Sequence, residues 1–435
     1  MDTIKIIGGN PLIGEVTPIP NKNAILSALP ASILTEKAVT YHNVPDTTDV
    51  NILLEILEKL GAKIDKTDFN NLTINCKNVK STKVDHDLGI RVRASIMFAG
   101  PLLARFGKAE IPLPGGCVLG KRSISAHIDV FSKVGVTTDY GENYVTFTAP
   151  KKLEKEYKIW QSEASVTATE NFALYAAGTN SAYTLIDAAS EPHVTQLLEL
   201  LNSMGAKISG IGANVINISG NQSLKSADYT PLPDFVDIAG LIVASAITNG
   251  NIRIKGANVF EVVGGFVNWF RKFNIDIKEE GNDLVVSKKG ELKIDPIKSG
   301  FPMATATLPK FSPRPWPGFP VDCLPPVVTL ATRTKGQILI QNWMYETGLD
   351  FIRELNKMGA NIMMCDPQKV IVTGPTKFKK SEIYTPAIIQ ACKAVFLASL
   401  CDPVETVLHG TEVLKRRYPN IYEVYKSLGV NIELL

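Results

Sequence analysis

The stretch LEKLGAKI (57–64) decides the fold, because closely similar stretches return five more times along the chain. Each copy has an apolar-periodic helix, then glycine or asparagine in the left-handed position past the helix end, then a strand. The further copies are FSKVGVTT (131–138), LNSMGAKI (201–208), FRKFNIDI (270–277), LNKMGANI (355–362) and YKSLGVNI (425–432). The pattern therefore predicts six units of roughly 70 residues, each mixing helix and strand.

A second strand is expected after a short turn in most units. The candidates are LTINC (72–76), YVTFTA (144–149), VINISG (215–220), DLVVSK (283–288) and VIVTG (370–374). A six-unit solenoid is one arrangement, but such repeats are usually shorter. Two domains of three units each fit the expected size of domains better, with the joint near PLPDF (231–235).

Composition and charge are those of an ordinary soluble globular protein. Of the 435 residues, 20% are charged and 45% hydrophobic, and the formal net charge is +3. That charge is too small to indicate a nucleic-acid partner, and the basic run 151–158 contains glutamates and is expected to be a solvated surface. The N-terminal segment lacks the pattern of a signal peptide, and the apolar runs are too short to span a bilayer. We therefore expect a cytoplasmic protein without a membrane partner.

The cysteines and histidines show no metal-binding or redox spacing. Six cysteines include no C-x-x-C pair, and the five histidines are scattered. We expect free thiols, no metal and no cofactor. Cys76, Cys365 and Cys392 lie in apolar runs and are expected to be small core residues.

The loop LPGGCVLGKRS (113–123) resembles a phosphate-binding P-loop but lacks one essential element. Arg122 stands where the metal-binding hydroxyl of G-x-x-x-x-G-K-[ST] belongs, and Pro114 interrupts the approach, which argues against nucleotide hydrolysis. Lys121 and Arg122 would favour the thiolate of Cys117 and could hold an anion. A turn without chemistry is the alternative.

Other polar residues lie where apolar helices begin. Lys22 and Asn23 open a helix expected to start at about Asn21, and Arg93 opens another apolar segment. A third cationic group, 415–417, precedes the last helix. Each alone is more simply a surface charge, but together they suit a phosphate-bearing substrate. The proline-rich segment 299–326 is expected to be an ordered loop, either functional or a tolerated insertion.

The chain resembles the enolpyruvyl transferases over nearly its full length, and among them the UDP-N-acetylglucosamine 1-carboxyvinyltransferases. The matching pieces are GEVTPIPNKNAIL, NVPDTTDVNILLEILEKLGAKI, RASIMFAGPLLARFG, LPGGCVLGKRSISAHI, LLNSMGAKISG and GFPVD. LPGGC followed by G-x-R is specific, and the sister enolpyruvylshikimate-phosphate synthases do not share it. The resemblance implies a two-domain inside-out α/β barrel, each domain built of three βαβαββ-type units around a pseudo-threefold axis.

The same resemblance implies the domain bounds and the partners. The first domain would span residues 22–232, and the second would combine 1–21 with 233–435, with the active site in the cleft between them. The substrates would be phosphoenolpyruvate and a hydroxyl acceptor, with no metal or cofactor. A monomer or weak homo-oligomer is expected.

The resemblance also implies roles for individual residues. Cys117 would act in proton transfer or form a covalent adduct, and would be alkylated by fosfomycin. Asp322, in GFPVD, would be the base or proton relay beside the attacking hydroxyl. Other residues would bind substrate: Lys22, Arg122 and Arg416 the phosphoenolpyruvate anions, Asn23 and Arg93 the acceptor or an anion, and Ser165 and Val166 the nucleotide phosphates.

The sequence departs from the family pattern mainly where the nucleotide binds. Five residues stand at positions that usually carry Asp, Gly, Arg, Arg and Arg, namely Ser125, Thr167, Phe235, Gly348 and Gln390, and Glu163 stands near a usual lysine. The long loop adds Arg314 and Trp316 near Asp322. The acceptor therefore stays open between UDP-N-acetylglucosamine and another hydroxyl acceptor such as a nucleoside monophosphate. A non-catalytic binding relative is a third hypothesis.

Overall fold

The computed structural model describes residues 2–113, 123–288 and 290–435. Within this part the chain divides into two compact units, each with its own set of sheets. We call residues 20–113 and 123–232 the middle unit. The remaining described residues, 2–19 together with those from 233 onward, form the terminal unit, which contains both chain ends. Cys117 and Arg122 lie outside the described residues.

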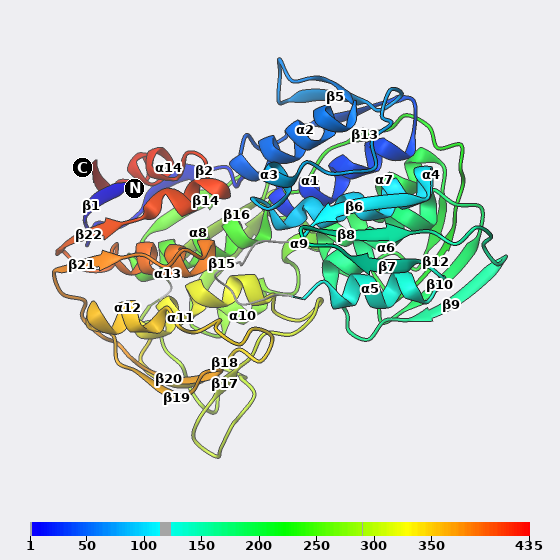
Figure 1. The fold of residues 1–435 in the computed structure, drawn as a ribbon. Helices are drawn as coiled ribbons and strands as arrows, with labels where there is room; N and C mark the ends of the chain where they lie inside the picture. The colour runs from blue at the N-terminus through cyan, green and yellow to red at the C-terminus, as the bar shows by residue number, and fades with distance from the viewer. Residues whose placement is uncertain (1, 114–122, 289) are drawn as a thin grey trace. The chain divides into compact units, whose positions relative to one another are not determined.

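The middle unit contains three sheets and the helices that pack on them (Figure 1). Its helices are α1 (Lys22–Ala28), η1 (Leu29–Leu34), α2 (Thr48–Leu60), α3 (His86–Gly89), η2 (Arg93–Phe98), α4 (Ala99–Phe106), α5 (Ser125–Ser132), α6 (Val166–Ala177) and α7 (Pro192–Met204). Its strands are β3 (Ala38–His42), β4 (Lys63–Asp65), β5 (Asn71–Asn75), β6 (Lys108–Pro112), β7 (Thr137–Tyr140), β8 (Tyr144–Thr148), β9 (Glu156–Trp160), β10 (Ala182–Ile186), β11 (Lys207–Ser209), β12 (Val215–Ser219) and β13 (Asp228–Tyr229).

The terminal unit also contains three sheets. Its helices are α8 (Phe235–Ile247), α9 (Phe260–Val263), α10 (Val267–Arg271), η3 (Val321–Cys323), α11 (Leu324–Thr332), α12 (Ile352–Lys357), α13 (Ile389–Ala398), η4 (Thr411–Arg416) and α14 (Ile421–Ser427). Its strands are β1 (Thr3–Ile7), β2 (Ile13–Val16), β14 (Asn251–Ile254), β15 (Ile275–Glu280), β16 (Asp283–Lys288), β17 (Lys310–Phe311), β18 (Gly336–Gln341), β19 (Ile362–Asp366), β20 (Lys369–Gly374), β21 (Ser381–Tyr384), β22 (Glu405–His409) and β23 (Asn431–Leu434).

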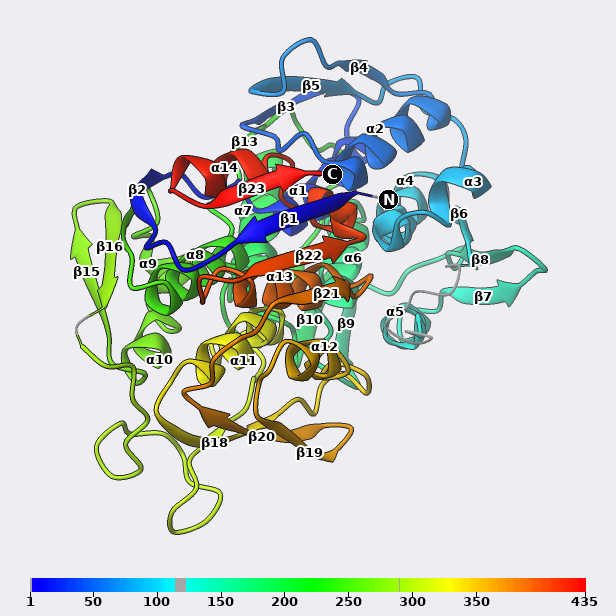
Figure 2. The same cartoon turned by 90° about the vertical axis from the view of Figure 1, so that its left-hand side faces the viewer.

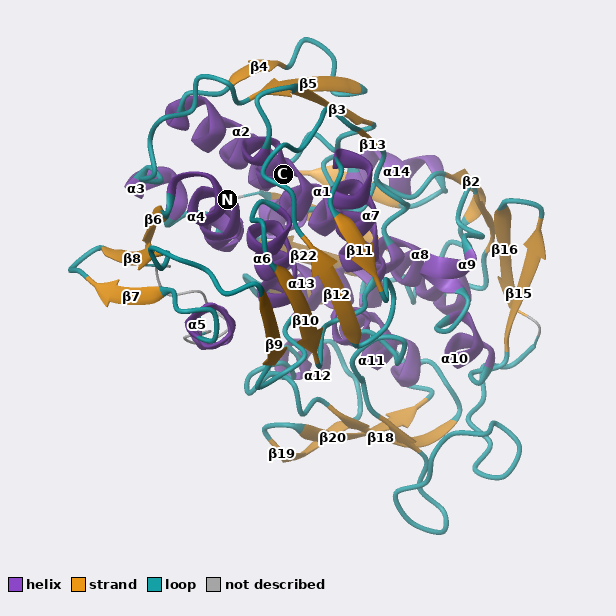
Figure 3. Cartoon of the chain, turned by 90° about the vertical axis from the view of Figure 1, so that its right-hand side faces the viewer, coloured by secondary structure: helices purple, strands orange, loops and turns teal. Residues whose placement is uncertain are grey.

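The four-stranded sheets share one pairing scheme, with one parallel pair followed by two antiparallel pairs. The orders are β13-β3-β5-β4 and β9-β10-β12-β11 in the middle unit, and β2-β14-β16-β15, β17-β18-β20-β19 and β21-β22-β1-β23 in the terminal unit. The third middle-unit sheet, β6-β8-β7, has a parallel bridge from Lys83 to Glu110 at the corresponding edge. Figure 3 shows β9, β10, β12 and β11 side by side.

The predicted helix ends are confirmed. The glycines of the repeated stretches and Asn274 all have positive φ, between 65° and 111°. Glycine tolerates this conformation because it has no Cβ, and asparagine is among the few other residues that adopt it readily. The expected second strands form as well, as β5, β8, β12, β16 and β20. In the sixth repeat, the N-terminal strand β1 lies between β22 and β23 (Figure 2).

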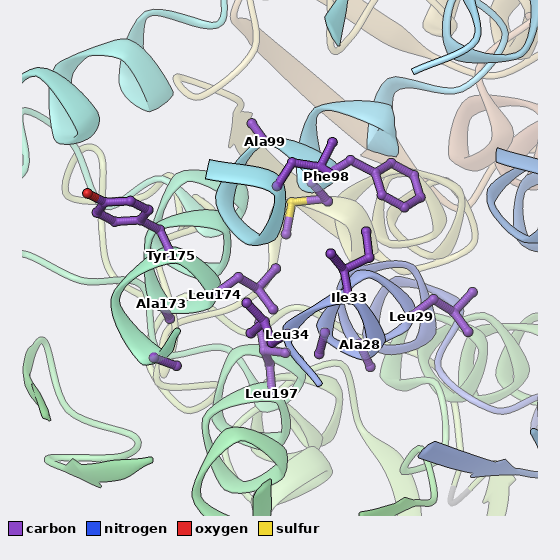
Figure 4. Packing of buried hydrophobic residues seen from close by; sticks show 14 of the residues in the cluster. Ala28, Leu29, Ile33, Leu34, Phe98, Ala99, Ala173, Leu174, Tyr175 and Leu197 are labelled. Carbon is purple, nitrogen blue, oxygen red and sulfur yellow. The ribbon is translucent and has the colours of Figure 1, made fainter. Parts of the chain in front are cut away.

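In both units, three apolar helical segments pack against one another. In the terminal unit these are α8, α11 and α13, and every residue of α8 and of α11 is buried. In the middle unit the three segments are α4, α6 and the continuous pair α1 and η1. Helix α4 packs against α6 and η1, and α1 contacts α6. Figure 4 shows Leu29, Ile33, Phe98, Leu174 and Leu197 converging in this core. Helices that are apolar all round must be surrounded by protein, which places the sheets outside them.

One expectation about the cysteines is wrong. Cys76 and Cys392 are buried as predicted, but Cys365 is exposed. It lies on β19, an edge strand whose pairing register shifts between Met364 and Asp366. An edge strand with one face toward solvent exposes residues of an apolar run, so Met363 and Met364 are exposed too.

Candidate functional site

The start of α1 presents Lys22 and Asn23 as the sequence predicts. The buried Asn21 caps the helix, and its Oδ1 accepts hydrogen bonds from the backbone N–H groups of Asn23 and Ala24 at 3.0 and 3.2 Å. Lys22 is therefore the first helical residue and is itself buried. A buried lysine is unusual unless its ammonium group is paired with a carboxylate or another acceptor.

The partner of Lys22 is Asp49, a residue that the sequence analysis did not single out. The Lys22 Nζ donates to Asp49 Oδ2 at 2.6 Å, and both side chains are less than a tenth exposed. Asp49 lies in the first turn of α2, where the helix dipole stabilises a carboxylate. The threonine cap before it, in DTTDV, is the only local signal, and it indicates a helix start but not a buried ion pair.

Arg93 begins η2 and lies near a buried histidine. Its Nη2 donates to the carbonyl oxygen of Ser123 at 3.3 Å. His127 accepts a hydrogen bond at Nδ1 from Asn171 Nδ2 at 3.1 Å, and its Nε2 lies 3.1 Å from Thr167 Oγ1. Burial, and secondarily the charge of Arg93, lowers the pKa of His127 to about 3. The imidazole is therefore neutral and donates from Nε2 to Thr167.

Ser165 and Val166 form the start of α6. Ser165 is the N-cap residue, and its side chain makes no capping hydrogen bond. The first N–H groups of a helix have no intrahelical acceptor, so the start of a long helix can bind an anion. The same segment contains the exposed Glu163, whose carbonyl oxygen accepts a hydrogen bond from Ser165 N at 2.7 Å. The negative charge of the Glu163 carboxylate disfavours the binding of an anionic ligand at the start of α6.

In the terminal unit, the start of α8 is bound to the segment before α14 by a buried ion pair. Asp234 caps α8, accepting from Val236 N at 2.8 Å, and it also receives both Nε and Nη2 of Arg417 at 2.9 and 3.0 Å. Asp234 is completely buried and Arg417 nearly so. Desolvation, the largest single effect, lowers the pKa of Arg417. The charges around it, foremost that of Asp234, and the hydrogen bonds to Asp234 together outweigh desolvation and raise this pKa above its usual range. The pair connects the chain next to Arg416 to the start of α8. Arg416 is the residue that the resemblance predicts to bind phosphoenolpyruvate.

Asp322 lies on η3, which packs against the start of α8. The adjacent Cys323 Sγ is 4.0 Å from the carbonyl oxygen of Phe235. Asp322 is half-buried, and its charge is among those that raise the pKa of Arg417. The terminal unit thus brings Asp322, Asp234 and Arg417 into one charged cluster. The ring of Trp316, from the long loop, lies 6.1 Å from the ring of Phe235.

The two positions at which the resemblance predicts arginine, Gly348 and Gln390, are filled differently. At Gly348 a Cβ would lie 2.1 Å from Asn342 Nδ2, so a side chain at this position would require the Asn342 side chain to move. Gln390 is buried, and its Nε2 donates to the hydroxyl of Tyr418 at 3.2 Å. One turn later, the buried Lys393 Nζ lies 4.3 Å from the centre of the Tyr418 ring. Burial lowers the pKa of Lys393 to about 8, partly offset by Asp237.

The described residues contain no cluster of three histidine, cysteine or carboxylate side chains suited to a metal ion. In the same part of the chain, no helix combines the length and apolarity needed to cross a membrane. Arg314 is exposed and makes no ion pair with another described residue. Its guanidinium therefore has no observed link to the cluster around Asp322.

These features match one family of enzymes. The sequence profile of EPSP synthase (3-phosphoshikimate 1-carboxyvinyltransferase) matches residues 6–425. The chain therefore belongs to this family, the enolpyruvyl (carboxyvinyl) transferases, as its sequence motifs indicated.

Individual relatives cover the whole chain. It is 36% identical to the UDP-N-acetylglucosamine 1-carboxyvinyltransferase of Treponema denticola over 430 residues, covering 99% of this chain and 98% of the relative. It is 35% identical to the enzyme of the same name from Bradyrhizobium diazoefficiens, covering 98% and 96%. Among solved structures, the enolpyruvyl transferase NikO from Streptomyces tendae superposes with a TM-score of 0.86 at 23% identity, covering 100% and 99%. EPSP synthase from Acinetobacter baumannii superposes with a TM-score of 0.75 at 16% identity, with full coverage of both chains. The mixed α/β fold is that of EPSP synthase.

Proposed function

We propose that this protein transfers the enolpyruvyl group of phosphoenolpyruvate to a hydroxyl of UDP-N-acetylglucosamine or a similar nucleotide or sugar. The observation that best supports the proposal is the buried Lys22 at the start of α1, held by Asp49. A cation placed in advance in a water-poor environment stabilises developing anionic charge more strongly than a solvated one. The identity of about 36% to UDP-N-acetylglucosamine enzymes supports this acceptor.

The proposed reaction is an addition followed by an elimination. Asp322 accepts the proton of the acceptor hydroxyl, whose oxygen forms a bond to C2 of phosphoenolpyruvate, while C3 takes up a proton. In the second step C3 loses a proton, the double bond re-forms, and the C2–O bond to phosphate breaks. Cys117 is proposed for proton transfer at C3. Lys22, Arg122 and Arg416 are proposed to bind the carboxylate and phosphate of phosphoenolpyruvate. The overall reaction changes no oxidation state and therefore requires no redox partner.

The acceptor is proposed to contact the remaining predicted residues. Asn23 and Arg93 would position its hydroxyl or an anionic group, and Ser165 and Val166 would receive a phosphate at the start of α6. The twelve-residue length of α6 and the missing side-chain cap at Ser165 support this role.

A second acceptor remains a candidate because of two observations at the same helix start. Thr167, where the resemblance predicts glycine, forms a hydrogen bond with His127, and Glu163 brings a negative charge near the place of a predicted lysine. Both changes disfavour a diphosphate at this place. An acceptor with a single phosphate, such as a nucleoside monophosphate, would suffer less from them.

The architecture that we propose is a two-domain inside-out α/β barrel. The middle and terminal units would be the two domains, each with three βαβαββ-type units about a pseudo-threefold axis. The common pairing scheme of the sheets supports it. Binding of the substrates between the domains, a cytoplasmic location and a monomeric or weakly associated state stay predictions from the resemblance.

The deciding experiment is phosphate release from phosphoenolpyruvate by the purified protein. We expect release that depends on UDP-N-acetylglucosamine and is lost in Asp322→Asn, with Lys278→Gln on the surface of β15 as the matched control. Release with UMP but not with UDP-N-acetylglucosamine would transfer the proposal to the second acceptor. No release with any nucleotide or amino-sugar acceptor, from folded protein, would favour a binding relative. Fosfomycin labelling that persists in Cys117→Ala would contradict the role of that thiol.

A further inference from the structure

A hollow lined by cations lies in the terminal unit, and none of its residues belongs to the proposed reaction. Its volume is about 480 Å³. All of its lining residues are polar or charged: Asn268, Arg271, Lys272, Asn274, Lys293, Asp295, Lys298 and Ser299. They come from α10 with the turn after it, and from the segment that follows β16. The cationic side chains of this lining favour an anionic ligand.

The positive charge of this hollow is not neutralised from within. Four cationic side chains face one carboxylate, Asp295, although the whole chain carries only +3. Asp295 is already engaged, since its Oδ1 accepts from the N–H groups of Ile297 and Lys298 at 3.0 Å, and its Oδ2 lies 3.6 Å from Lys293 Nζ. These hydrogen bonds keep the pKa of Asp295 low, so it holds its charge. The charge of Lys298 also acts on Asp295, but the two side chains form no ion pair within 4.0 Å among the described residues.

Two of the cations are held in place. Arg271 donates from Nη2 to Glu279 Oε1 at 2.7 Å and to the carbonyl oxygen of Ile277 at 3.0 Å. Lys272 donates to the carbonyl oxygen of Gly300, and its Nζ lies 5.3 Å from the centre of the Trp269 ring. Charges that are ordered before binding lose less entropy when a ligand arrives. Glu279 offsets one charge, and the excess remains positive.

We propose that this hollow binds a small, soluble phosphate compound carrying at least two negative charges, at a site separate from the one that performs enolpyruvyl transfer. Several cations converging from two chain segments provide more positive charge than one carboxylate requires, and they suit the many oxygens of a phosphate. The Ser299 Oγ accepts from Asp295 N at 2.7 Å, which leaves the hydroxyl proton free to donate to the ligand. The volume has room for a diphosphate or a phosphorylated sugar.

The test is isothermal titration of the full-length protein with inorganic pyrophosphate at low ionic strength. We expect a dissociation constant below about 1 mM. It should rise at least about threefold when sodium chloride screens these exposed charges. Lys298→Glu should weaken binding about tenfold or more. The matched control is Lys278→Glu, because that side chain is equally a surface lysine of this unit and lies outside the hollow. Thermal unfolding of each variant verifies that it is folded.

A further variant separates this site from the proposed active site. Arg416→Gln should leave pyrophosphate binding in the hollow unchanged, whether or not the protein proves to be an enolpyruvyl transferase. If Arg416→Gln abolished pyrophosphate binding and Lys298→Glu left it unchanged, the probe would bind at the proposed active site. That result would overturn the inference. Equal weakening by Lys298→Glu and Lys278→Glu, or no binding by wild-type protein, would overturn it as well.

Discussion

Arg417 and Asp234 form a two-point ion pair across 183 residues of sequence, with Nε and Nη2 of the arginine 2.9 and 3.0 Å from the two carboxylate oxygens. The pair joins the end of η4 to the first turn of α8. Its aspartate also caps that helix, so one carboxylate performs two structural tasks. Arg416, the adjacent residue, is proposed to bind substrate, and the pair fixes the backbone from which its side chain extends.

Removing the arginine should destabilise the protein strongly. Arg417→Ala leaves a buried carboxylate without a counter-charge, which typically costs about 3–5 kcal/mol of unfolding free energy. Urea unfolding followed by circular dichroism measures the change. Arg416→Ala is the neighbouring control, and its half-buried side chain should cost less than about 1 kcal/mol. A loss below about 1 kcal/mol for Arg417→Ala would show that the pair contributes little.

The Lys22–Asp49 pair should behave as a coupled unit. Each single change, Lys22→Met or Asp49→Leu, removes the observed counter-charge of the remaining buried charge, whereas the double variant removes both charges. In a double-mutant cycle we therefore expect the double variant to be at least about 1.5 kcal/mol more stable than the sum of the single effects predicts. Additive effects within about 0.5 kcal/mol would contradict the buried pair. Phosphate release should be lost in every variant that lacks Lys22.

His127 should make stability depend on pH under mildly acidic conditions. Its pKa is about 3 in the folded protein against 6.5 for an ordinary histidine, so the unfolded chain binds a proton first as the pH falls. The stabilising difference is present above pH 6.5 and is lost as the pH falls toward 3, by at most about 1.4 kcal/mol per pH unit.

The measurement compares wild-type protein with His127→Gln, which keeps a neutral polar side chain. Between pH 6 and pH 4, urea unfolding should show the wild type losing about 2 kcal/mol more than the variant. Parallel pH curves would mean that the histidine is protonated in the folded state. Other groups titrate in both proteins and cancel in the difference.

The cysteines should differ sharply in reactivity. Burial raises the pKa of Cys76, Cys392 and Cys401 to about 12, and that of Cys323 rises as well, so their thiolates are scarce. In a Cys117→Ala background, iodoacetamide at pH 8 should label the exposed Cys365 alone. Mass spectrometry of tryptic peptides identifies the site, and Cys365→Ser should abolish labelling. Rapid labelling of any buried cysteine in folded protein would contradict the burial.

Local features of this fold could be predicted from the sequence because they depend on neighbouring residues. The left-handed positions at Gly61 and Asn274 follow from a helix pattern interrupted by a residue that tolerates positive φ. The cap of α1 at Asn21 follows from the capping preference of asparagine. The sequence does not reveal Asp49 as the partner of Lys22, because a carboxylate in a first helical turn is ordinarily solvated. It does not reveal the exposure of Cys365 either, because an apolar run does not indicate that its strand lies at a sheet edge.

What the sequence by itself determined is the repeating helix and strand pattern and the family; the reactive residues stay predictions from the resemblance. The tertiary structure alone decided which charges are buried and paired, since Asp234 meets Arg417 and Lys22 meets Asp49 only after distant helices pack. It also decided that β1 completes the sheet of the last repeat, between β22 and β23. The physical reason is that periodicity and capping act over a few residues. Desolvation and strand pairing depend on neighbours that the fold brings together from far along the chain.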